Sequence, residues 1–210
     1  MASSSERTPV VFVIDDDASI RDSLALMLGL AGYATRLFAD AESFLAACQP
    51  DWTGCVVADL RLPGMSGIEL QAKLAALGSR MPFIVITAHG DVPAARTAFR
   101  ANAVDFIEKP FEESQLQTAI AAALAIEAER VTAAEQRRDI EEKLARLTSR
   151  ERHVLEQAAK GLHAKEIAEV LGISVRTVEV HKTRIMDKLN VRNIGELVRF
   201  ALGGEERGRR

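Results

Sequence analysis

The first part of the chain alternates short apolar runs with helix-forming segments, and this alternation constrains the fold more than any other feature. The runs at 10–14 and 83–87 are continuous and of strand length, as expected for strands buried on both faces of a parallel sheet. Further strands are predicted at 34–38, 55–59 and 104–107, with helices at 19–31, 41–48, 68–77, 93–101 and from 112 onward. Five such alternations predict an α/β fold, a doubly wound five-stranded parallel sheet with helices on both faces.

Polar residues stand where four of these strands end. Asp15 and Asp16 follow the first strand, Asp59 ends the third, Thr87 ends the fourth and Lys109 follows the fifth. Because ligands bind at the carboxyl edge of an open parallel sheet, we expect these side chains to lie together. Three neighbouring carboxylates need a cation, and Mg²⁺ is the expected cofactor because it prefers oxygen ligands. With Thr87 and Lys109 holding phosphoryl oxygens, Asp59 is the predicted nucleophile.

The stretch that follows this front module is predicted to be a helical linker. It contains no glycine or proline from 119 to 147 and consists mainly of good helix formers. Apolar residues recur at 120, 124 and 131 and at 140, 144 and 147, whereas 132–139 is polar. A coiled coil and a solvated helical spacer are both compatible with this pattern.

The rear of the chain is predicted to be an all-α domain of four helices. Helices are expected from 149, at 163–171, at 175–190 and at 194–202, with a glycine-containing turn between the second and third. This arrangement indicates a helix-turn-helix reader. The third helix carries cations and hydroxyls of the kind that bind DNA phosphates, namely Arg176, Thr177, His181, Lys182, Arg184 and Lys188. A solvated helix in a small bundle is the alternative.

Charge is distributed unevenly between these modules. Residues 1–124 carry nine Lys or Arg against fifteen Asp or Glu, whereas residues 148–210 carry thirteen against nine. A basic rear module favours a polyanionic partner. No apolar run approaches the roughly 20 residues that span a bilayer, and the Ser-rich segment 1–8 is not a secretory signal, so we expect a cytoplasmic protein with no membrane partner. Cys48 and Cys55 are expected to be reduced packing residues.

Residues 1–124 resemble the receiver domain of two-component response regulators, which has a flavodoxin-like fold. The resemblance rests on Ile14-Asp15-Asp16, the run from Asp59 to Gly67, Thr87-Ala88-His89-Gly90 and Asp105-Phe106-Ile107-Glu108-Lys109-Pro110. It implies Asp59 as the phosphoacceptor, Thr87 and Lys109 as the residues that stabilise the phosphoryl group, and Phe106 as a switch aromatic. It further implies that Mg²⁺ binds Asp16 directly, together with Asp59 and the backbone carbonyl of Arg61, and that Asp15 is its water-mediated or second acidic partner.

Residues 147–202 resemble the LuxR or NarL type of DNA-binding domain. The resemblance rests on Leu147-Thr148-Ser149-Arg150-Glu151, Lys165-Glu166-Ile167-Ala168, Ile173-Ser174, Thr177-Val178-Glu179-Val180-His181 and Lys188-Leu189. It implies that Glu179, Val180 and Thr183 face base edges in the major groove, with Lys182 and neighbouring cations on phosphates. Glu179 either accepts a hydrogen bond from a cytosine amine or sets the register of the helix on the DNA through an arginine. The sequence is compatible with both roles.

Together the two resemblances are those of a response regulator of the FixJ type, with a receiver at 1–124, a linker at 125–146 and a DNA-binding domain at 147–210. They imply a sensor histidine kinase, double-stranded promoter DNA, RNA polymerase and a phosphorylation-dependent homodimer as partners. They also imply that the protein is a phosphoacceptor regulator and not an enzyme. The only reactions implied are self-catalysed phosphoryl transfer and slow autodephosphorylation.

Two alternatives remain. A receiver with a protein-binding or RNA-binding output is one. An aspartate-nucleophile phosphohydrolase is the other, but it requires a second acid two residues after Asp59, where this chain has Arg61.

Overall fold

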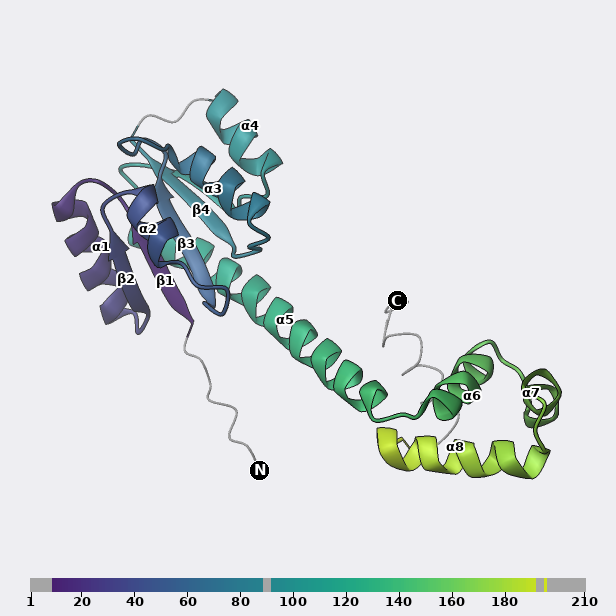
Figure 1. The fold of residues 1–210 in the computed structure, drawn as a ribbon. Helices are drawn as coiled ribbons and strands as arrows, with labels where there is room; N and C mark the ends of the chain where they lie inside the picture. Colours follow the sequence, from purple (N-terminus) through teal and green to yellow (C-terminus); the bar gives the residue numbers. More distant parts are fainter. Residues whose placement is uncertain (1–8, 89–91, 192–194, 196–210) are drawn as a thin grey trace. The chain divides into compact units, whose positions relative to one another are not determined.

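The computed structural model describes residues 9–88, 92–191 and 195. It divides into two compact units, Met1–Val131 and Thr132–Arg210, which are described in turn. Figure 1 shows a sheet with flanking helices in the first unit and helices in the second. The predicted helix at 194–202, apart from residue 195, and the loop residues His89 and Gly90 lie outside the described residues.

The first unit contains the predicted five-stranded parallel sheet. Its strands are β1 Val10–Ile14, β2 Ala34–Phe38, β3 Gly54–Asp59, β4 Phe83–Thr87 and β5 Asp105–Glu108. The strand order is β2-β1-β3-β4-β5, and every neighbouring pair is parallel. The strand order reverses between β1 and β3, and such a reversal opens a crevice at the carboxyl ends of the two strands.

Helices cover both faces of this sheet, as the sequence predicts. They are α1 Ala18–Leu30, α2 Ala41–Ala47, α3 Gly67–Ala76, α4 Val92–Arg100 and α5 Glu113–Ala145. One core cluster joins the sheet to α1 and α5, and the other joins it to α2, α3 and α4 (Figure 1). Packing against both faces explains why the strands read as continuous apolar runs.

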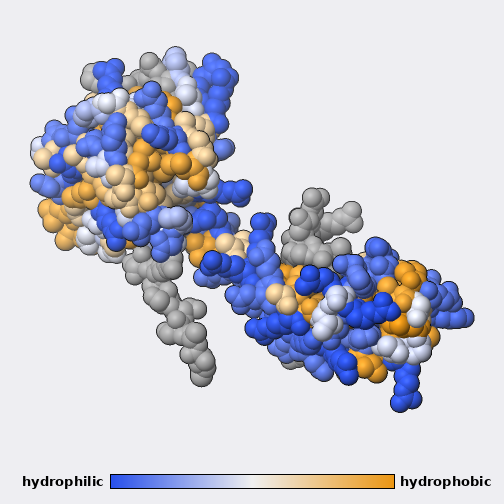
Figure 2. Space-filling view, viewed as in Figure 1, coloured by the Kyte–Doolittle hydropathy of each residue, from blue (hydrophilic) through white to orange (hydrophobic). Residues whose placement is uncertain are grey.

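The apolar residues of α1 do not all face the sheet. Leu24 and Leu28 are buried, but Leu30 is 81% exposed. Two residues past Leu28 the helix has turned by about 200°, so Leu30 points away from the sheet. In Figure 2 apolar side chains also reach the surface of this unit in places, and the exposed large hydrophobic residues include Leu26, Leu30, Leu37, Leu77 and Phe99.

The second unit contains the end of α5 followed by α6 Ser149–Ala159, α7 Ala164–Leu171 and α8 Val175–Leu189. Its core includes Leu147, Val154, Leu155, Ile167, Val178, Ile185 and Leu189. Gly172 adopts the left-handed conformation (φ 62°) that ends α7, and Ser174 caps α8. The predicted helix–turn–helix is therefore confirmed.

The linker is helical, as predicted. It forms one continuous helix with the last helix of the first unit, because α5 runs without interruption from Glu113 to Ala145. Residues 132–139 are all exposed, whereas Ile120 is buried and Leu144 packs partly against the core of the second unit. Within the described ranges, no helix combines the length and apolarity needed to cross a membrane.

Candidate functional site

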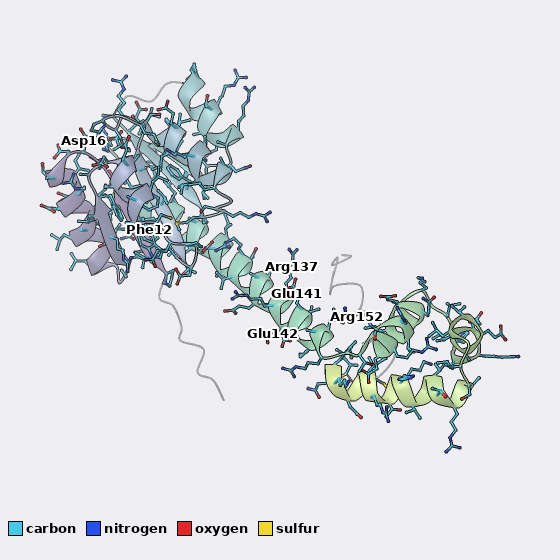
Figure 3. The ribbon with its side chains drawn as sticks, viewed as in Figure 1. Phe12, Asp16, Arg137, Glu141, Glu142 and Arg152 are labelled. Atoms are coloured by element: carbon cyan, nitrogen blue, oxygen red, sulfur yellow. The ribbon has the colours of Figure 1, made fainter. Side chains whose placement is uncertain are left out.

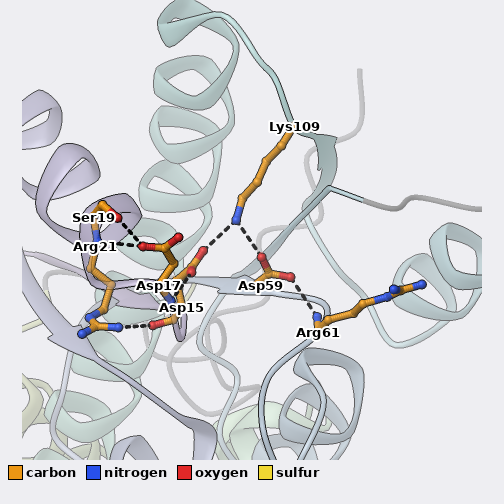
Figure 4. A network of polar contacts seen from close by, with 7 residues as sticks. All are labelled: Asp15, Asp17, Ser19, Arg21, Asp59, Arg61 and Lys109. Carbon is orange, nitrogen blue, oxygen red and sulfur yellow. Dashed lines mark hydrogen bonds and ion pairs between the residues drawn. The ribbon is translucent and has the colours of Figure 1, made fainter.

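Two acidic side chains meet one lysine at the carboxyl edge of the sheet. Lys109 Nζ lies 2.6 Å from Asp59 Oδ2 and 2.7 Å from Asp15 Oδ2. Figure 4 shows the three side chains converging from the ends of β1, β3 and β5. The carboxylates come from the two strands between which the strand order reverses, where ligands bind in sheets of this kind.

Backbone and side-chain donors hold both carboxylates in place. Asp59 Oδ1 accepts a hydrogen bond from the backbone N–H of Arg61 at 2.8 Å, and Asp15 Oδ1 accepts one from the N–H of Asp17 at 3.0 Å. Asp17 in turn caps α1 by accepting a hydrogen bond from the N–H of Ser19. Arg21 donates to the backbone carbonyl of Asp15 at 2.6 Å. Each carboxylate therefore has one oxygen held by the backbone and the other directed at Lys109.

The electrostatics of the site follow from burial and pairing. Asp15 is 1% exposed and Asp59 is 8% exposed. Burial lowers the pKa of the Lys109 ammonium, but the hydrogen bonds and negative charges of Asp15 and Asp59 raise it by more, so the pKa lies above its ordinary value. Lys109 is thus a permanent cation between two anions, an arrangement suited to a site that takes up further negative charge.

The loop after Asp59 is packed closely against the strand that carries it. The N–H of Gly67 donates to the carbonyl of Leu60 at 3.0 Å, and a Cβ at position 67 would lie 2.4 Å from the carbonyl oxygen of Asp59. Ser66 and Glu69 form a capping box that starts α3 at this point. Position 67 thus holds the end of β3 through a contact that tolerates no side chain.

Other residues predicted for this site lie around it. Thr87 is fully buried at the end of β4, and its carbonyl accepts a hydrogen bond from the N–H of Lys109 at 2.7 Å. Phe106 is partly buried against the core on the α2, α3 and α4 side of the sheet. Asp16 is exposed beyond the end of β1, as Figure 3 shows relative to Phe12 in the middle of that strand. The Arg61 side chain extends away from the two carboxylates (Figure 4).

The expected cluster of three carboxylates is not formed. Among the described residues, no group of three or more His, Cys, Asp or Glu side chains is placed to hold a metal ion. The physical reason is that Lys109 neutralises Asp15 and Asp59 directly, while Asp16 stays exposed. The donor chemistry still suits Mg²⁺, because the carboxylates of Asp15 and Asp59 lie close enough to share the Lys109 ammonium and a third acid, Asp16, is adjacent in the chain.

In the second unit, helix α8 presents several of the predicted DNA-binding residues. Of these residues, Arg176, Glu179, Val180, Thr183 and Arg184 are exposed, and Thr177 and His181 are half-buried. Residues at 176, 179, 180 and 183 follow helical spacing and share one face. The imidazole Nδ1 of His181 is buried and has no hydrogen-bond partner among the described residues, so His181 is only partly available to a ligand.

Two lysines of α8 differ from the sequence prediction of an exposed cationic face. The Lys182 side chain is only 8% exposed, and its Nζ lies 3.2 Å from Glu179 Oε1. It is buried because it falls on the core stripe of the helix. Lys188 Nζ lies 2.6 Å from Glu151 Oε2 and 3.2 Å from the carbonyl of Arg146, so it ties α8 to the start of α6.

Glu151 is a residue whose importance the sequence indicates only in part. Its capping box with Thr148 at the start of α6 can be recognised from the sequence motif. Its buried ion pair with Lys188 joins residues 37 positions apart, and no pattern in the local sequence predicts it. Burial raises the pKa of this carboxyl, yet Lys188 and the hydrogen bonds from Thr148 lower it further, to about 2. Glu151 is therefore an ionised link between two helices.

Comparisons with known proteins match both units. A family model described as "Response regulator receiver domain" matches residues 11–121, and one described as "Bacterial regulatory proteins, luxR family" matches residues 145–201. The transcriptional regulatory protein FixJ of Azorhizobium caulinodans is 45% identical over 192 residues, which cover 91% of each chain. Among solved structures, the response regulator StyR has a TM-score of 0.85 and 45% identity, covering 93% of this chain and 98% of that one. Full-length FixJ from B. japonicum has a TM-score of 0.58 and 42% identity, covering 93% and 96%.

Proposed function

The chain belongs to the response regulators of the FixJ type, which join a receiver domain to a LuxR-family DNA-binding domain and regulate transcription, and on that basis we propose that Asp59 is its phosphoacceptor. The family implies a sensor kinase as partner of the receiver and DNA as partner of the second domain. The observation that carries the assignment to Asp59 is the shared contact of Lys109 with Asp59 and Asp15 at the carboxyl edge of the sheet.

Phosphoryl transfer to Asp59 requires mainly positioning and charge neutralisation. An oxygen of the Asp59 carboxylate attacks the phosphorus of the donor, which is the phosphorylated kinase or a small acyl phosphate, and the bond from phosphorus to the donor breaks. The N–H of Arg61 keeps the carboxylate oriented, and Lys109 neutralises the oxygens of the incoming group. Thr87, at the end of the neighbouring strand, supplies a hydroxyl to those oxygens.

Receiver domains generally bind Mg²⁺ for phosphorylation. In this chain Asp15, Asp16, Asp59 and the backbone carbonyl of Arg61 would hold the ion. When bound, Mg²⁺ adds positive charge that offsets the repulsion between the carboxylates and the phosphoryl oxygens. The role of the protein residues is to present oxygen donors close together, and the proximity of the Asp15 and Asp59 carboxylates, which share the Lys109 ammonium, supports this assignment.

Phosphorylation is proposed to alter the first domain through Thr87 and Phe106. Negative charge on Asp59 attracts the Thr87 hydroxyl, and Phe106 follows into the space on its side of the sheet, where it already packs partly against the core. The altered surface promotes a homodimer. Two DNA-binding domains then bind a two-fold promoter site together, because one small helix-turn-helix domain has little affinity alone. Slow autodephosphorylation resets the protein.

The second domain is proposed to bind promoter DNA through α8 and to act on RNA polymerase in the cytoplasm. The exposed cations Arg176 and Arg184 suit phosphates, and Glu179, Val180 and Thr183 lie on one exposed face suited to base edges. Thr177 and His181 border that face. We propose domain limits of 1–124 and 147–210, with 125–146 as the linker.

Sedimentation of the full chain, with and without acetyl phosphate, tests this proposal. With Mg²⁺ present, wild type is expected to shift from monomer to dimer, and Asp59→Asn is expected to remain monomeric. A salt-sensitive gel shift of duplex DNA by the phosphorylated protein separates a DNA-binding output from a protein-binding or RNA-binding one. A dimer shift that is undiminished in Asp59→Asn would refute the role of Asp59.

A further inference from the structure

Lys182 occupies a position in α8 that is otherwise reserved for apolar residues. The buried residues of this helix are Val178, Lys182, Ile185 and Leu189, at spacings of four, three and four. Such spacing places all four side chains on the face that packs against the rest of the domain. A lysine is rarely buried unless its charge is paired, so its ammonium must have a partner.

That partner is Glu179, one turn earlier in the same helix. Lys182 Nζ lies 3.2 Å from Glu179 Oε1, and the exposed fractions of the two side chains are 8% and 58%. Helical side chains lean toward the helix N-terminus, so the stem of Lys182 runs over the core and its ammonium emerges beside residue 179. Within the described part of the chain, Lys182 is the only cation within ion-pair distance of Glu179.

Glu179 itself lies on the face of α8 that is proposed to enter the major groove. It is exposed together with Val180 and Thr183, and Arg176 precedes it by one turn. A lone carboxylate in this position would be repelled by the DNA phosphates. Lys182 reduces this repulsion by neutralising Glu179 through Oε1, while the Glu179 side chain stays 58% exposed, so that its carboxylate can still accept a hydrogen bond.

We propose that Lys182 is a positioning residue that holds the carboxylate of Glu179 to accept a hydrogen bond from the exocyclic amine of a cytosine in each half-site. The proposal rests on the DNA-binding function proposed above, and it assigns Lys182 to base selection instead of phosphate contact.

Cytosine is the base that this acceptor favours. In the major groove a cytosine presents its N4 amine as a donor, whereas an adenine presents its N6 amine beside the N7 acceptor, which repels a carboxylate. A glutamine side chain has both a donor and an acceptor and matches adenine instead. The charge of Glu179, maintained by Lys182, therefore distinguishes the two amines.

The test is selection of duplexes from a pool with a randomised centre, using the full-length protein phosphorylated with acetyl phosphate and Mg²⁺. Wild type and Lys182→Arg are expected to prefer cytosine about tenfold at one position of each half-site. Lys182→Met is expected to lose this preference while the slope of log affinity against log salt stays unchanged. As a matched control, Arg184→Ala is expected to keep the preference and to reduce that slope by about 1.

Glu179→Gln provides a second variant that does not disturb the core, because its side chain is exposed. It is expected to shift the preference at the same position from cytosine to adenine. The inference is overturned if Lys182→Met keeps the cytosine preference, whether or not the salt slope falls by about 1. It is also overturned if Glu179→Gln leaves the preference unchanged. Failure of wild type to bind any duplex would instead refute the DNA-binding output, and this inference with it.

Discussion

The ammonium of Lys109 lies 2.6 Å from Oδ2 of Asp59, although 50 residues separate them in the chain. The contact exists because β3 and β5 end at the same edge of the sheet, on either side of β4. Since the same ammonium also binds Asp15 at 2.7 Å, it offsets the repulsion between two buried carboxylates.

Lys109→Met is expected to lower the free energy of unfolding of the receiver domain by about 2 kcal/mol, because Asp15 and Asp59 lose their shared cation. Urea denaturation followed by tryptophan fluorescence measures this domain alone, since the only tryptophan of the chain, Trp52, stacks on Phe12 in its core. Lys73→Met, at an exposed position of α3, is the control and is expected to change stability little. Equal unfolding midpoints for both variants would contradict the expectation.

Mg²⁺ is expected to raise the urea midpoint of the Trp52 transition, because an ion that binds only the folded state stabilises it by mass action. Asp16→Asn is expected to weaken this effect, and removal of Mg²⁺ with a chelator to abolish it. Asp22→Asn, an exposed acid on α1, serves as the control. A Mg²⁺ effect that is the same in both variants would remove Asp16 from the proposed metal site.

Gly67→Ala is expected to destabilise the receiver domain by about 2 kcal/mol and to slow phosphorylation of Asp59, because the new methyl group would press on the Asp59 carbonyl 2.4 Å away. Gly29→Ala is the matched control, since a Cβ there would have no atom within 4 Å apart from its chain neighbours and the backbone of its own helix. That helical substitution is expected to stabilise by about 0.5 kcal/mol. The phosphorylation rate is measured by labelling with acetyl phosphate, and the stability by urea unfolding followed through Trp52 fluorescence. Labelling of Gly67→Ala at the wild-type rate would be inconsistent with the packing described.

Stability of the DNA-binding domain is expected to fall as the pH drops from 4.5 toward 2. The pKa of Glu151 is lowered from 4.5 to about 2 in the folded protein, so the stability it contributes is complete above 4.5 and is lost as the carboxyl is protonated through the folded value. Unfolding is followed by circular dichroism. The transition of the DNA-binding domain is the one that Trp52 fluorescence does not report. Glu151→Gln should lack this pH dependence, and Glu156→Gln, at an exposed site on α6, should retain it.

The sheet and its site were predictable because their signals are local. Five apolar runs locate the strands, and the residue that follows each run must lie at the carboxyl edge, so the sequence predicts the approach of Asp15, Asp59, Thr87 and Lys109. Strand β5 begins at Asp105, one residue later than predicted, where it pairs with Ile84. The direct neutralisation of the carboxylates by Lys109 depends on side-chain geometry that the strand pattern does not contain.

Lys182 shows how a local signal can be misread. Its spacing from Val178 and Ile185 places it on the buried stripe of α8, but its charge suggests an exposed phosphate contact. Periodicity decides the position of the Cα atom, and the long side chain then places the charge beside the carboxylate of Glu179. By contrast, the pairing of Lys188 with Glu151 joins α8 to α6 and has no counterpart in the local sequence.

The mass of the intact protein after incubation with acetyl phosphate and Mg²⁺ tests the central claim most directly. Wild type is expected to gain one phosphoryl group, and Asp59→Asn is expected to gain none while it keeps the same Trp52 unfolding transition. Equal labelling of Asp59→Asn would show that another residue accepts the phosphoryl group and would contradict the account of the site.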